Sequence, residues 1–368
     1  MPQLLSFLLF LVTTTSITFI LATSLNIQFG NAGLVNFGQV VFLCLGAYSG
    51  AIAFNAGLHP ALCLLIAAAV CGAAGLLMSF TVRDMSGTYW GIVTLCTAEL
   101  VRLVINNESW IANGANGLSL VRRIPSIQPL VLGMALAALL LALLIARSPF
   151  GRTLRLIREG DRLPLALGKD VRLFKMQAMA IGGIFGGVAG CLYSFLNGYI
   201  SPQDCMPIET FILWAMVVVG GSGSVAGIVL GTLVVQTLYV GSRFLTHLVD
   251  IPADRLAALR LVLIGLLIAL TMMYRPEGVL PERRRLHHRR DHAGLPRLRR
   301  RPGARHAAAA GGAGPRARAA RAQVSLARAR GLRAVSRRQA SLFLQRGGQD
   351  QGQHRPPVAA GRRRLRRL

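Results

Sequence analysis

The sequence predicts an all-α membrane protein, a polytopic helical bundle of about eight or nine spans with one broken or re-entrant segment. Two observations predict this class. Of the 368 residues, 53% are hydrophobic and only 15% are charged, a composition too apolar for a soluble enzyme of this length. The apolar residues also gather in runs of about 20, the length that crosses a hydrocarbon core of about 30 Å.

The apolar runs follow one another in residues 1–280, which we interpret as one transmembrane domain. They lie near residues 4–24, 39–56, 60–80, 88–107, 129–146, 174–197, 208–240 and 257–274. The first run has no basic residue before it and is longer than the apolar part of a secretory signal, so we expect it to remain as a span. The run 208–240 contains GGSGS at residues 220–224 and forms either one tilted helix or two segments broken at the glycines.

Charged residues set the expected orientation, because cytoplasmic loops are enriched in Lys and Arg. The loop 147–175 has eight basic residues and three acidic ones, whereas the loop 198–209 has only Asp204 and Glu209. We therefore place 147–175 in the cytoplasm and 198–209 outside. Two crossings by the run 208–240 keep Arg275 on the cytoplasmic side, so we favour the broken pair. Counting back along the chain places the N-terminus outside.

Five glycines fall within the helix expected near 174–197, at positions 182, 183, 186, 187 and 190. Small residues spaced in this way let neighbouring helices approach closely in lipid. We expect tight packing of this helix, with a moving hinge as the alternative.

Residues 281–368 form a tail of different composition. Arg, Ala, Gly and Pro supply 58 of its 88 residues, no Lys is present, and the tail carries +22 of the net charge of +27. Because residue types with GC-rich codons dominate, we expect either a frameshift artefact that follows a natural end near Arg285 or a disordered arm. Such an arm would bind anionic lipid headgroups. Nucleic acid is not expected as a partner, because Phe343 is the only aromatic residue in the tail that could stack on bases.

A polar segment, SLNIQFGNAGLVNFGQ at residues 24–39, follows the first span. It contains three glycines and five uncharged hydrogen-bonding side chains, Asn26, Gln28, Asn31, Asn36 and Gln39. Irregular backbone at membrane depth persists only where protein or a water-filled cavity covers it. The five residues are therefore the candidate pathway for a polar solute, and a loop at the membrane surface is the alternative.

Other residues offer little chemistry of their own. Glu99 and Arg102 lie three positions apart in one expected span, so we predict a structural ion pair, with a role in gating as the alternative. The six cysteines follow no pairing or metal-binding pattern, and we interpret them as small buried hydrophobic residues. No metal site and no phosphate-binding loop are visible. Any energy source must come from another subunit or from an ion gradient.

The basic loop contains an apolar stripe formed by Leu154, Ile157 and Leu165. The stripe predicts a short amphipathic helix on the cytoplasmic face. Such a helix rests on lipid headgroups or docks into a groove of a soluble partner, and the residues alone do not choose between the two.

Four blocks, taken together and in this order, carry a family resemblance. They are SLNIQFGNAGLVNFGQVVFLCLGAY (24–48), TYWGIVTLCTAELVRLVINN (88–107) with NGANGL (113–118), SPFGRTLRLIREGDRLPLALG (148–168), and VVVGGSGSVAGIVLG (217–231). The chain resembles the permeases of branched-chain amino acid ABC transporters, of the LivM type. The resemblance implies a multi-pass protein of the bacterial inner membrane that is a transport subunit without enzymatic activity.

The resemblance also implies partners. These are a second permease of LivH type, two ATPase subunits that use ATP, and a periplasmic substrate-binding protein that delivers leucine, isoleucine or valine; no cofactor is expected on this chain itself. The basic loop would be the ATPase-coupling segment, with Arg158, Glu159, Asp161, Ala166 and Gly168 as its residues. Pro164 departs from the family pattern and is expected to shorten or kink the docking helix.

The alternative function is a gradient-driven carrier or channel for a small polar solute such as another amino acid, an amide or urea. Carriers of this class use acidic residues within spans for ion coupling, and Glu99 is the one candidate here.

Overall fold

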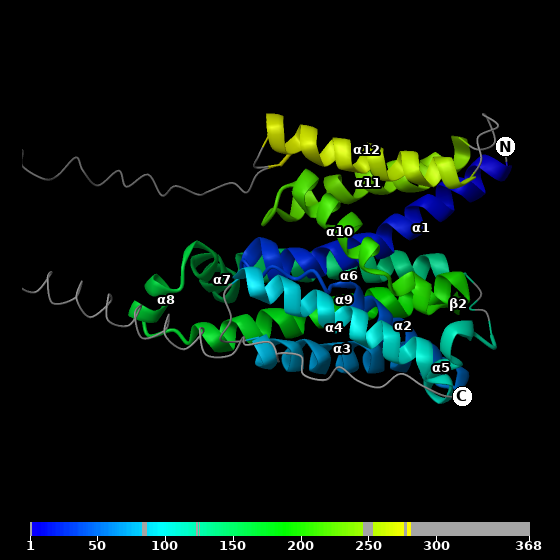
Figure 1. Ribbon diagram of the computed structural model, residues 1–368, viewed down its shortest axis with the longest axis horizontal. Coiled ribbons are helices and arrows are strands. Elements are labelled where there is room, and N and C mark those ends of the chain that lie inside the picture. Colours follow the sequence, from blue (N-terminus) through cyan, green and yellow to red (C-terminus); the bar gives the residue numbers. More distant parts are fainter. Residues whose placement is uncertain are drawn as a thin grey trace, which may run out of the picture. The chain divides into compact units, whose positions relative to one another are not determined.

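Helices dominate the protein, because a segment inside the hydrocarbon core must satisfy its own backbone hydrogen bonds. The computed structural model describes residues 2–82, 87–122, 124, 126–245, 253–275 and 278–280, all within the unit Met1–Leu286. The tail predicted at 281–368 lies outside the described residues. The all-α prediction is confirmed (Figure 1).

The apolar helices begin and end close to the predicted runs. Among the described residues, five helices are long and apolar enough to cross a membrane, and four shorter helices are also apolar. They are α1 (Pro2–Leu25), α2 (Val40–Asn55), α3 (Pro60–Val82), α4 (Gly87–Asn107), α6 (Ile127–Arg147), α9 (Val171–Asn197), α10 (Pro207–Gly220), α11 (Val225–Leu245) and α12 (Ala253–Tyr274).

The run 208–240 is broken, as predicted. Helix α10 ends at Gly220 and α11 begins at Val225. Between them Gly221 has φ +109° and Gly223 has φ +85°, a region of backbone conformation that favours glycine. The break is covered by the segment that follows α12, because Leu280 N donates to Gly220 O at 3.1 Å.

Helix α9 is the central helix of the bundle, and its glycines serve close packing. In its apolar stretch of 18 residues, 67% of the residues are buried, whereas only 17% are buried in the corresponding stretch of α6. A Cβ atom at Gly183 would overlap the carbonyl oxygen of Cys71 on α3, and one at Gly190 would overlap that of Leu43 on α2. The packing interpretation of these glycines is therefore confirmed, since α9 contacts the backbones of both neighbours.

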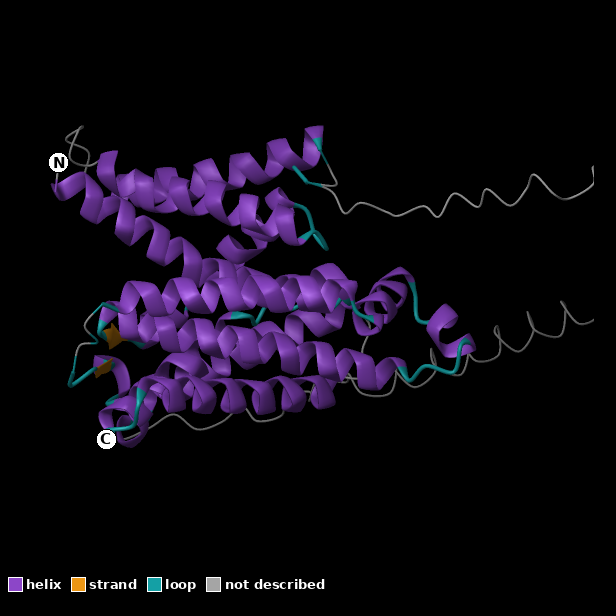
Figure 2. Ribbon diagram, turned by 180° about the vertical axis from the view of Figure 1, so that it is seen from behind, coloured by secondary structure: helices purple, strands orange, loops and turns teal. Residues whose placement is uncertain are grey.

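Short elements occupy the two ends of the bundle. One end holds α7 (Pro149–Glu159) and α8 (Arg162–Ala166), and the other holds α5 (Ser109–Ala112), η2 (Gly114–Asn116) and η3 (Pro202–Cys205) (Figure 1). A small antiparallel sheet of β1 (Leu118–Ser119) and β2 (Tyr199–Ile200), which the sequence did not predict, lies at this second end (Figure 2). The loop expected in the cytoplasm and the loop expected outside thus lie at opposite ends.

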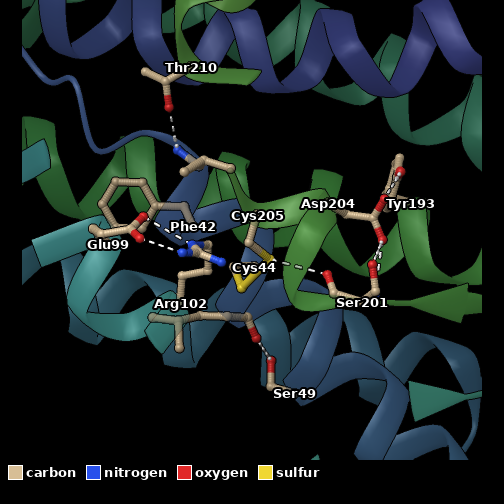
Figure 3. Close-up of a disulfide and its surroundings, with 12 residues drawn as sticks. Phe42, Cys44, Ser49, Glu99, Arg102, Tyr193, Ser201, Asp204, Cys205 and Thr210 are labelled. Carbon is tan, nitrogen blue, oxygen red and sulfur yellow. Dashed lines mark hydrogen bonds and ion pairs between the residues drawn. A yellow bond between two sulfur atoms is a disulfide. The ribbon is translucent and has the colours of Figure 1, made fainter. Parts of the chain in front are cut away.

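The prediction that no cysteine is paired was wrong. Cys44 on α2 and Cys205 in η3 form a disulfide with a Cα–Cα distance of 5.6 Å (Figure 3). The two lie 161 residues apart, and only the packed fold brings them together. Disulfides persist in oxidising compartments, which agrees with the expected location of the loop 198–209 outside. Cys96 is exposed, also against expectation, whereas the other free cysteines, Cys63, Cys71 and Cys191, are buried as predicted.

Candidate functional site

The polar segment lies in the protein interior. After α1, the π-helix η1 (Asn26–Asn31) is followed by irregular backbone up to α2. The five predicted side chains are each at most 3% exposed: Asn26, Gln28, Asn31, Asn36 and Gln39. Protein therefore covers the segment, as the pathway interpretation requires of irregular backbone at membrane depth.

Asn36 is the centre of a hydrogen-bond network among these side chains. Its Nδ2 donates to Gln28 Oε1 at 2.7 Å and to Gln39 Oε1 at 3.1 Å. Gln39 Nε2 donates to Ser24 Oγ at 2.5 Å, and that hydroxyl donates to the carbonyl oxygen of Gly182 at 2.5 Å. Buried polar groups need such partners, and here they join the segment to α1 and α9.

The same segment is also joined to α10 and to the break that follows it. Gly223 N donates to Asn26 Oδ1 at 2.8 Å. The indole Nε1 of Trp214 donates to the backbone oxygen of Asn36 at 3.0 Å. A change in the angle between α10 and α11 would therefore pull directly on the polar segment.

Two atoms of the polar segment lack a hydrogen-bond partner within the described part of the chain. They are Gln28 Nε2 and Asn31 Oδ1, and both are buried. An unpaired buried donor or acceptor costs about 1–3 kcal/mol. A state of the protein in which solute or water reached these atoms would recover that cost.

The basic loop forms two helices where one was expected. Ser148 caps α7 by accepting from Gly151 N at 3.1 Å, and Leu154 and Ile157 are buried beneath the helix. Gly160, with φ +150°, then ends α7. Leu165 is 59% exposed on the next helix, so the predicted stripe was right for its first two residues and wrong for the third.

Arg158 points into the protein from α7. Its guanidinium Nη1 donates to the carbonyl oxygen of Gly30 in η1, and a Cβ at Gly33 would lie 3.1 Å from the Arg158 Cγ. The other four residues predicted for coupling, Glu159, Asp161, Ala166 and Gly168, are exposed. The structure thus separates one predicted coupling residue, which contacts the polar segment, from four that face outward.

Helix α8 is short, and its end is fixed by the backbone. Pro164 is its third residue, where the first turn tolerates the missing N–H. Gly168, with φ +70°, donates to Leu165 O at 3.0 Å, and Lys169 N donates to Pro164 O at 3.0 Å. This pair of bonds is the Schellman motif that ends helices. The five-residue length of α8 is thus set by Gly168, and the effect of Pro164 on docking stays a prediction.

Sequence reasoning missed two leucines beside Leu165. Leu163 is 61% exposed and Leu167 is 68% exposed. Exposed apolar clusters mark interaction sites. The available signal was the alternation of leucines in RLPLALG at 162–168.

Glu99 and Arg102 form an ion pair on α4. Arg102 Nε donates to Glu99 Oε2 at 3.0 Å, and its Nη2 donates to the other carboxylate oxygen (Figure 3). Neither residue hydrogen-bonds to the polar segment or to α7 in the bonds of the described chain.

No group of three or more potential metal ligands occurs among the residues that the structure describes.

Comparison with known proteins identifies the family. Residues 7–272 match the family described as "Branched-chain amino acid transport system / permease component". The chain belongs to this family. The permease is therefore a multi-pass membrane transport subunit and not an enzyme.

The relatives of this permease are named for two kinds of solute, branched-chain amino acids and autoinducer 2. It is 31% identical over 304 residues to the high-affinity branched-chain amino acid transport system permease protein LivM of Escherichia coli strain K12, covering 73% of this chain and 69% of that protein. It is 28% identical to a probable LivM of Methanocaldococcus jannaschii, covering 72% and 90%. It is 27% identical to the autoinducer 2 import permease LsrC of Yersinia enterocolitica, covering 54% and 57%. No solved structure shows significant similarity to the chain.

Proposed function

We propose that this permease imports leucine, isoleucine or valine across the bacterial inner membrane, as one half of a pore in an ATP-driven complex. The second half would be a permease of LivH type. Two ATPase subunits would bind and hydrolyse ATP, and a periplasmic substrate-binding protein would deliver the amino acid. Similarity to LivM proteins over 73% of the chain supports the solute, and the exposed surface of α8 supports the ATPases.

The coupling surface consists of α8 and the residues next to it. Leu163, Leu165 and Leu167 supply an exposed apolar centre, and Ala166 and Gly168 leave room for a partner to approach closely. Glu159 and Asp161 supply charges around it. An apolar centre with a charged rim is typical of protein interfaces, and an ATPase is the cytoplasmic partner expected for this family.

Two contacts would carry a movement of this surface into the membrane. Lys175 Nζ at the start of α9 binds Asp161 Oδ2 at 2.9 Å, so a displacement of α8 pulls on the central helix. Arg158 binds the Gly30 carbonyl, so a displacement of α7 pulls on η1. Coupling through packed elements requires a chain of contacts of this kind.

The polar segment would form the cytoplasmic gate of the pathway. Asn26, Gln28, Asn31, Asn36 and Gln39 are buried and mainly bonded to one another or to neighbouring helices. Opening would exchange these bonds for bonds to water and solute. The uncharged amides suit a zwitterionic solute, because they both donate and accept hydrogen bonds.

The test is uptake of labelled leucine by cells that lack their own permease. The cells receive the partner subunits with the full chain, with a chain truncated after Arg285, or with full-length Leu165→Asp; Leu165→Met is the control for the last. We expect uptake that requires both ATPase and binding protein, and loss of ATPase copurification in Leu165→Asp alone. Uptake without the ATPases would instead indicate a gradient-driven carrier. Absence of leucine uptake by inserted full-length and truncated chains would contradict the proposed solute.

A further inference from the structure

Helix α4 carries charge in the middle of its span. Of the five described helices that are long and apolar enough to cross a membrane, α4 is the one with charged residues away from both ends, namely Glu99 and Arg102. Ala98 is the middle residue of this span, Tyr89–Asn107. Glu99 follows Ala98 directly, and Arg102 lies about 6 Å from it along the helix axis. Both charges therefore lie near the middle of a hydrocarbon core of about 30 Å.

The face of α4 that carries Glu99 is not covered by the rest of the described chain. Ile92, Cys96, Glu99 and Leu103 follow the spacing of one helical face. Ile92 is 54% exposed, Leu103 is 44% exposed, and Cys96 is also exposed. The Glu99 side chain is 37% exposed. Because a charge that faces hydrocarbon at this depth is costly, this face is unsuited to lipid.

Helix α6 shows how a face suited to lipid differs in the same permease. Only 17% of its apolar stretch is buried, and its exposed side chains include Leu136, Leu140 and Leu144. Its charged residue, Arg147, is the last residue of the helix. The two helices are thus both exposed in the middle, but α4 alone of the two presents charge there.

The ion pair on α4 has hydrogen-bonding capacity left over. Arg102 uses two of the five N–H donors of a guanidinium, one on each oxygen of Glu99 (Figure 3). Neither residue has another hydrogen bond or ion pair with any residue that the structure describes. Three donors and about half of the acceptor positions of the carboxylate remain. A ligand with both an ammonium and a carboxylate group can therefore bind without breaking the pair.

Helix α4 also contacts the polar segment. The Phe37 backbone N donates to Thr94 Oγ1 at 3.2 Å, and a Cβ atom at Gly38 would overlap the carbonyl oxygen of Thr94. Thr94 lies about one and a half turns before Glu99, toward the end of α4 that the expected orientation places in the cytoplasm. A solute that moves inward along α4 would thus meet the ion pair first and the proposed gate second.

We propose that this face of α4 lines the solute pathway of the assembled complex, and that Glu99 and Arg102 bind the ammonium and carboxylate groups of the amino acid. Leu100 and Leu103, 62% and 44% exposed, lie against its aliphatic side chain. Charge-assisted hydrogen bonds of this kind are strong. The choice of an aliphatic amino acid as the ligand rests on the proposed function.

Cys96 is a natural reporter of what covers this face, because it is a free, exposed thiol one turn from Glu99. The full chain, with its partner permease and ATPases in lipid nanodiscs, is treated with a cationic trimethylammonium methanethiosulfonate. The mass of this subunit then reports the labelling. Such reagents attack thiolates, which form in water and not in lipid. Cys96→Ser gives the background, and Cys96→Ser combined with Leu136→Cys on α6 is the matched control.

We expect Cys96 to be labelled at least about tenfold faster than the cysteine at position 136, because water reaches α4 and not α6. Equal rates overturn the inference. In that case lipid covers the face, or the partner permease covers it in a contact that excludes water.

The charge of Glu99 is tested without any solute. The rate of Cys96 labelling by the cationic reagent is divided by the rate with an anionic sulfonate reagent of the same kind. Glu99→Gln should lower this ratio about threefold, because the carboxylate attracts the ammonium group of the cationic reagent. Glu108→Gln, exposed beyond the end of α4, should leave the ratio unchanged. An unchanged ratio in Glu99→Gln would show that the carboxylate is not open to an ammonium group.

Binding of labelled leucine tests the ligand. Glu99→Gln combined with Arg102→Gln keeps two side chains that hydrogen-bond to each other but removes both charges. We expect the Kd for leucine to rise about tenfold, with an unchanged elution volume in size-exclusion chromatography. A pair with a purely structural role would leave the Kd of this folded variant at the wild-type value, which overturns the proposed site.

Failure of the proposed function gives a different result. If the wild-type complex binds no leucine, the choice of solute is wrong. Fast labelling of Cys96 and its dependence on the Glu99 charge would still support a pathway along α4. The absence of both effects overturns the inference as well.

Discussion

Hydrogen-bonded polar side chains occur at both ends of this bundle, and the two groups are built differently. Toward α7, the amides of Gln28, Asn36 and Gln39 are bonded to one another and carry no charge. Toward η3, the Asp204 carboxylate accepts hydrogen bonds from Ser201 and Tyr193 beside a cavity of about 220 Å³. The amide network joins α1 and α9 through Ser24 and leaves Gln28 Nε2 without a partner among the described residues, whereas Asp204 fixes the short element η3. The first group is therefore held by hydrogen bonds alone, whereas the second also lies next to a disulfide.

Gly190→Val should disrupt the packing at both ends of the bundle, because α9 contributes to each. The side chain would overlap the Leu43 carbonyl, and backbone overlap exceeds the cost of about 1–3 kcal/mol typical of overpacking. We expect loss of folded protein, measured by size-exclusion chromatography of the extracted permease. Gly133→Val on α6, where a Cβ meets nothing within 4 Å, is the control. A folded Gly190→Val permease would show that α2 and α9 are not held this closely.

Cys205→Ser should affect the cavity end and leave the other end intact. Loss of a disulfide costs about 2–4 kcal/mol, and η3 would no longer be tied to α2. We expect lower thermal stability, with copurification of the ATPases unchanged. Cys96→Ser removes a free, exposed thiol and should change nothing. If Cys205→Ser and Cys96→Ser are equally stable, the disulfide does not stabilise the permease.

Asn36→Leu should affect the opposite end. It leaves Gln28 and Gln39 without their donor and Gly38 N without its acceptor, at about 1–3 kcal/mol for unsatisfied buried groups. We expect a lower unfolding temperature and leak of solute through the proposed gate in proteoliposomes. Asn107→Leu, on the exposed end of α4, is the control. If proteoliposomes with Asn36→Leu do not leak solute, the polar segment does not form the gate.

Arg158→Ala should have the smallest effect on stability, because this side chain is partly exposed. The substitution removes the hydrogen bond to the Gly30 carbonyl and weakens the link between α7 and η1. We expect uptake to fall about tenfold, which corresponds to about 1.4 kcal/mol, with ATP hydrolysis retained. Arg152→Ala, exposed on the same helix, should transport normally. If the two variants transport equally, the contact is not part of coupling.

Much of the fold could be predicted from the sequence, because each apolar run had to become a helix. The bounds of α3 and α4 and the break after Gly220 follow from local composition alone. The burial of Asn26 and Gln28 was also predictable, since polar residues beside glycines at membrane depth need cover.

The remaining features depend on contacts between residues far apart in the chain. Cys44 and Cys205 meet only once α2 and η3 are packed. Gln236 is one polar residue in an apolar run, and only the packed fold brings it to the same cavity as Asp204. The sequence predicted Arg158 as one residue of the coupling segment. In the structure, Gly160 ends α7, and the Arg158 guanidinium donates to the carbonyl oxygen of Gly30. Periodicity along one helix carries none of this information.

The π-helix η1 makes the length of its segment as important as its composition. A π-turn closes its hydrogen bonds five residues apart in place of four, so it holds one residue more than an α-helical turn. Each residue of an α-helix rotates the chain by about 100°. Deleting a single residue between Asn26 and Asn31 would therefore let α1 continue as an ordinary helix and turn every later amide of the segment away from its partner. Insertions and deletions should be tolerated less at this point of the chain than any exchange of side chains.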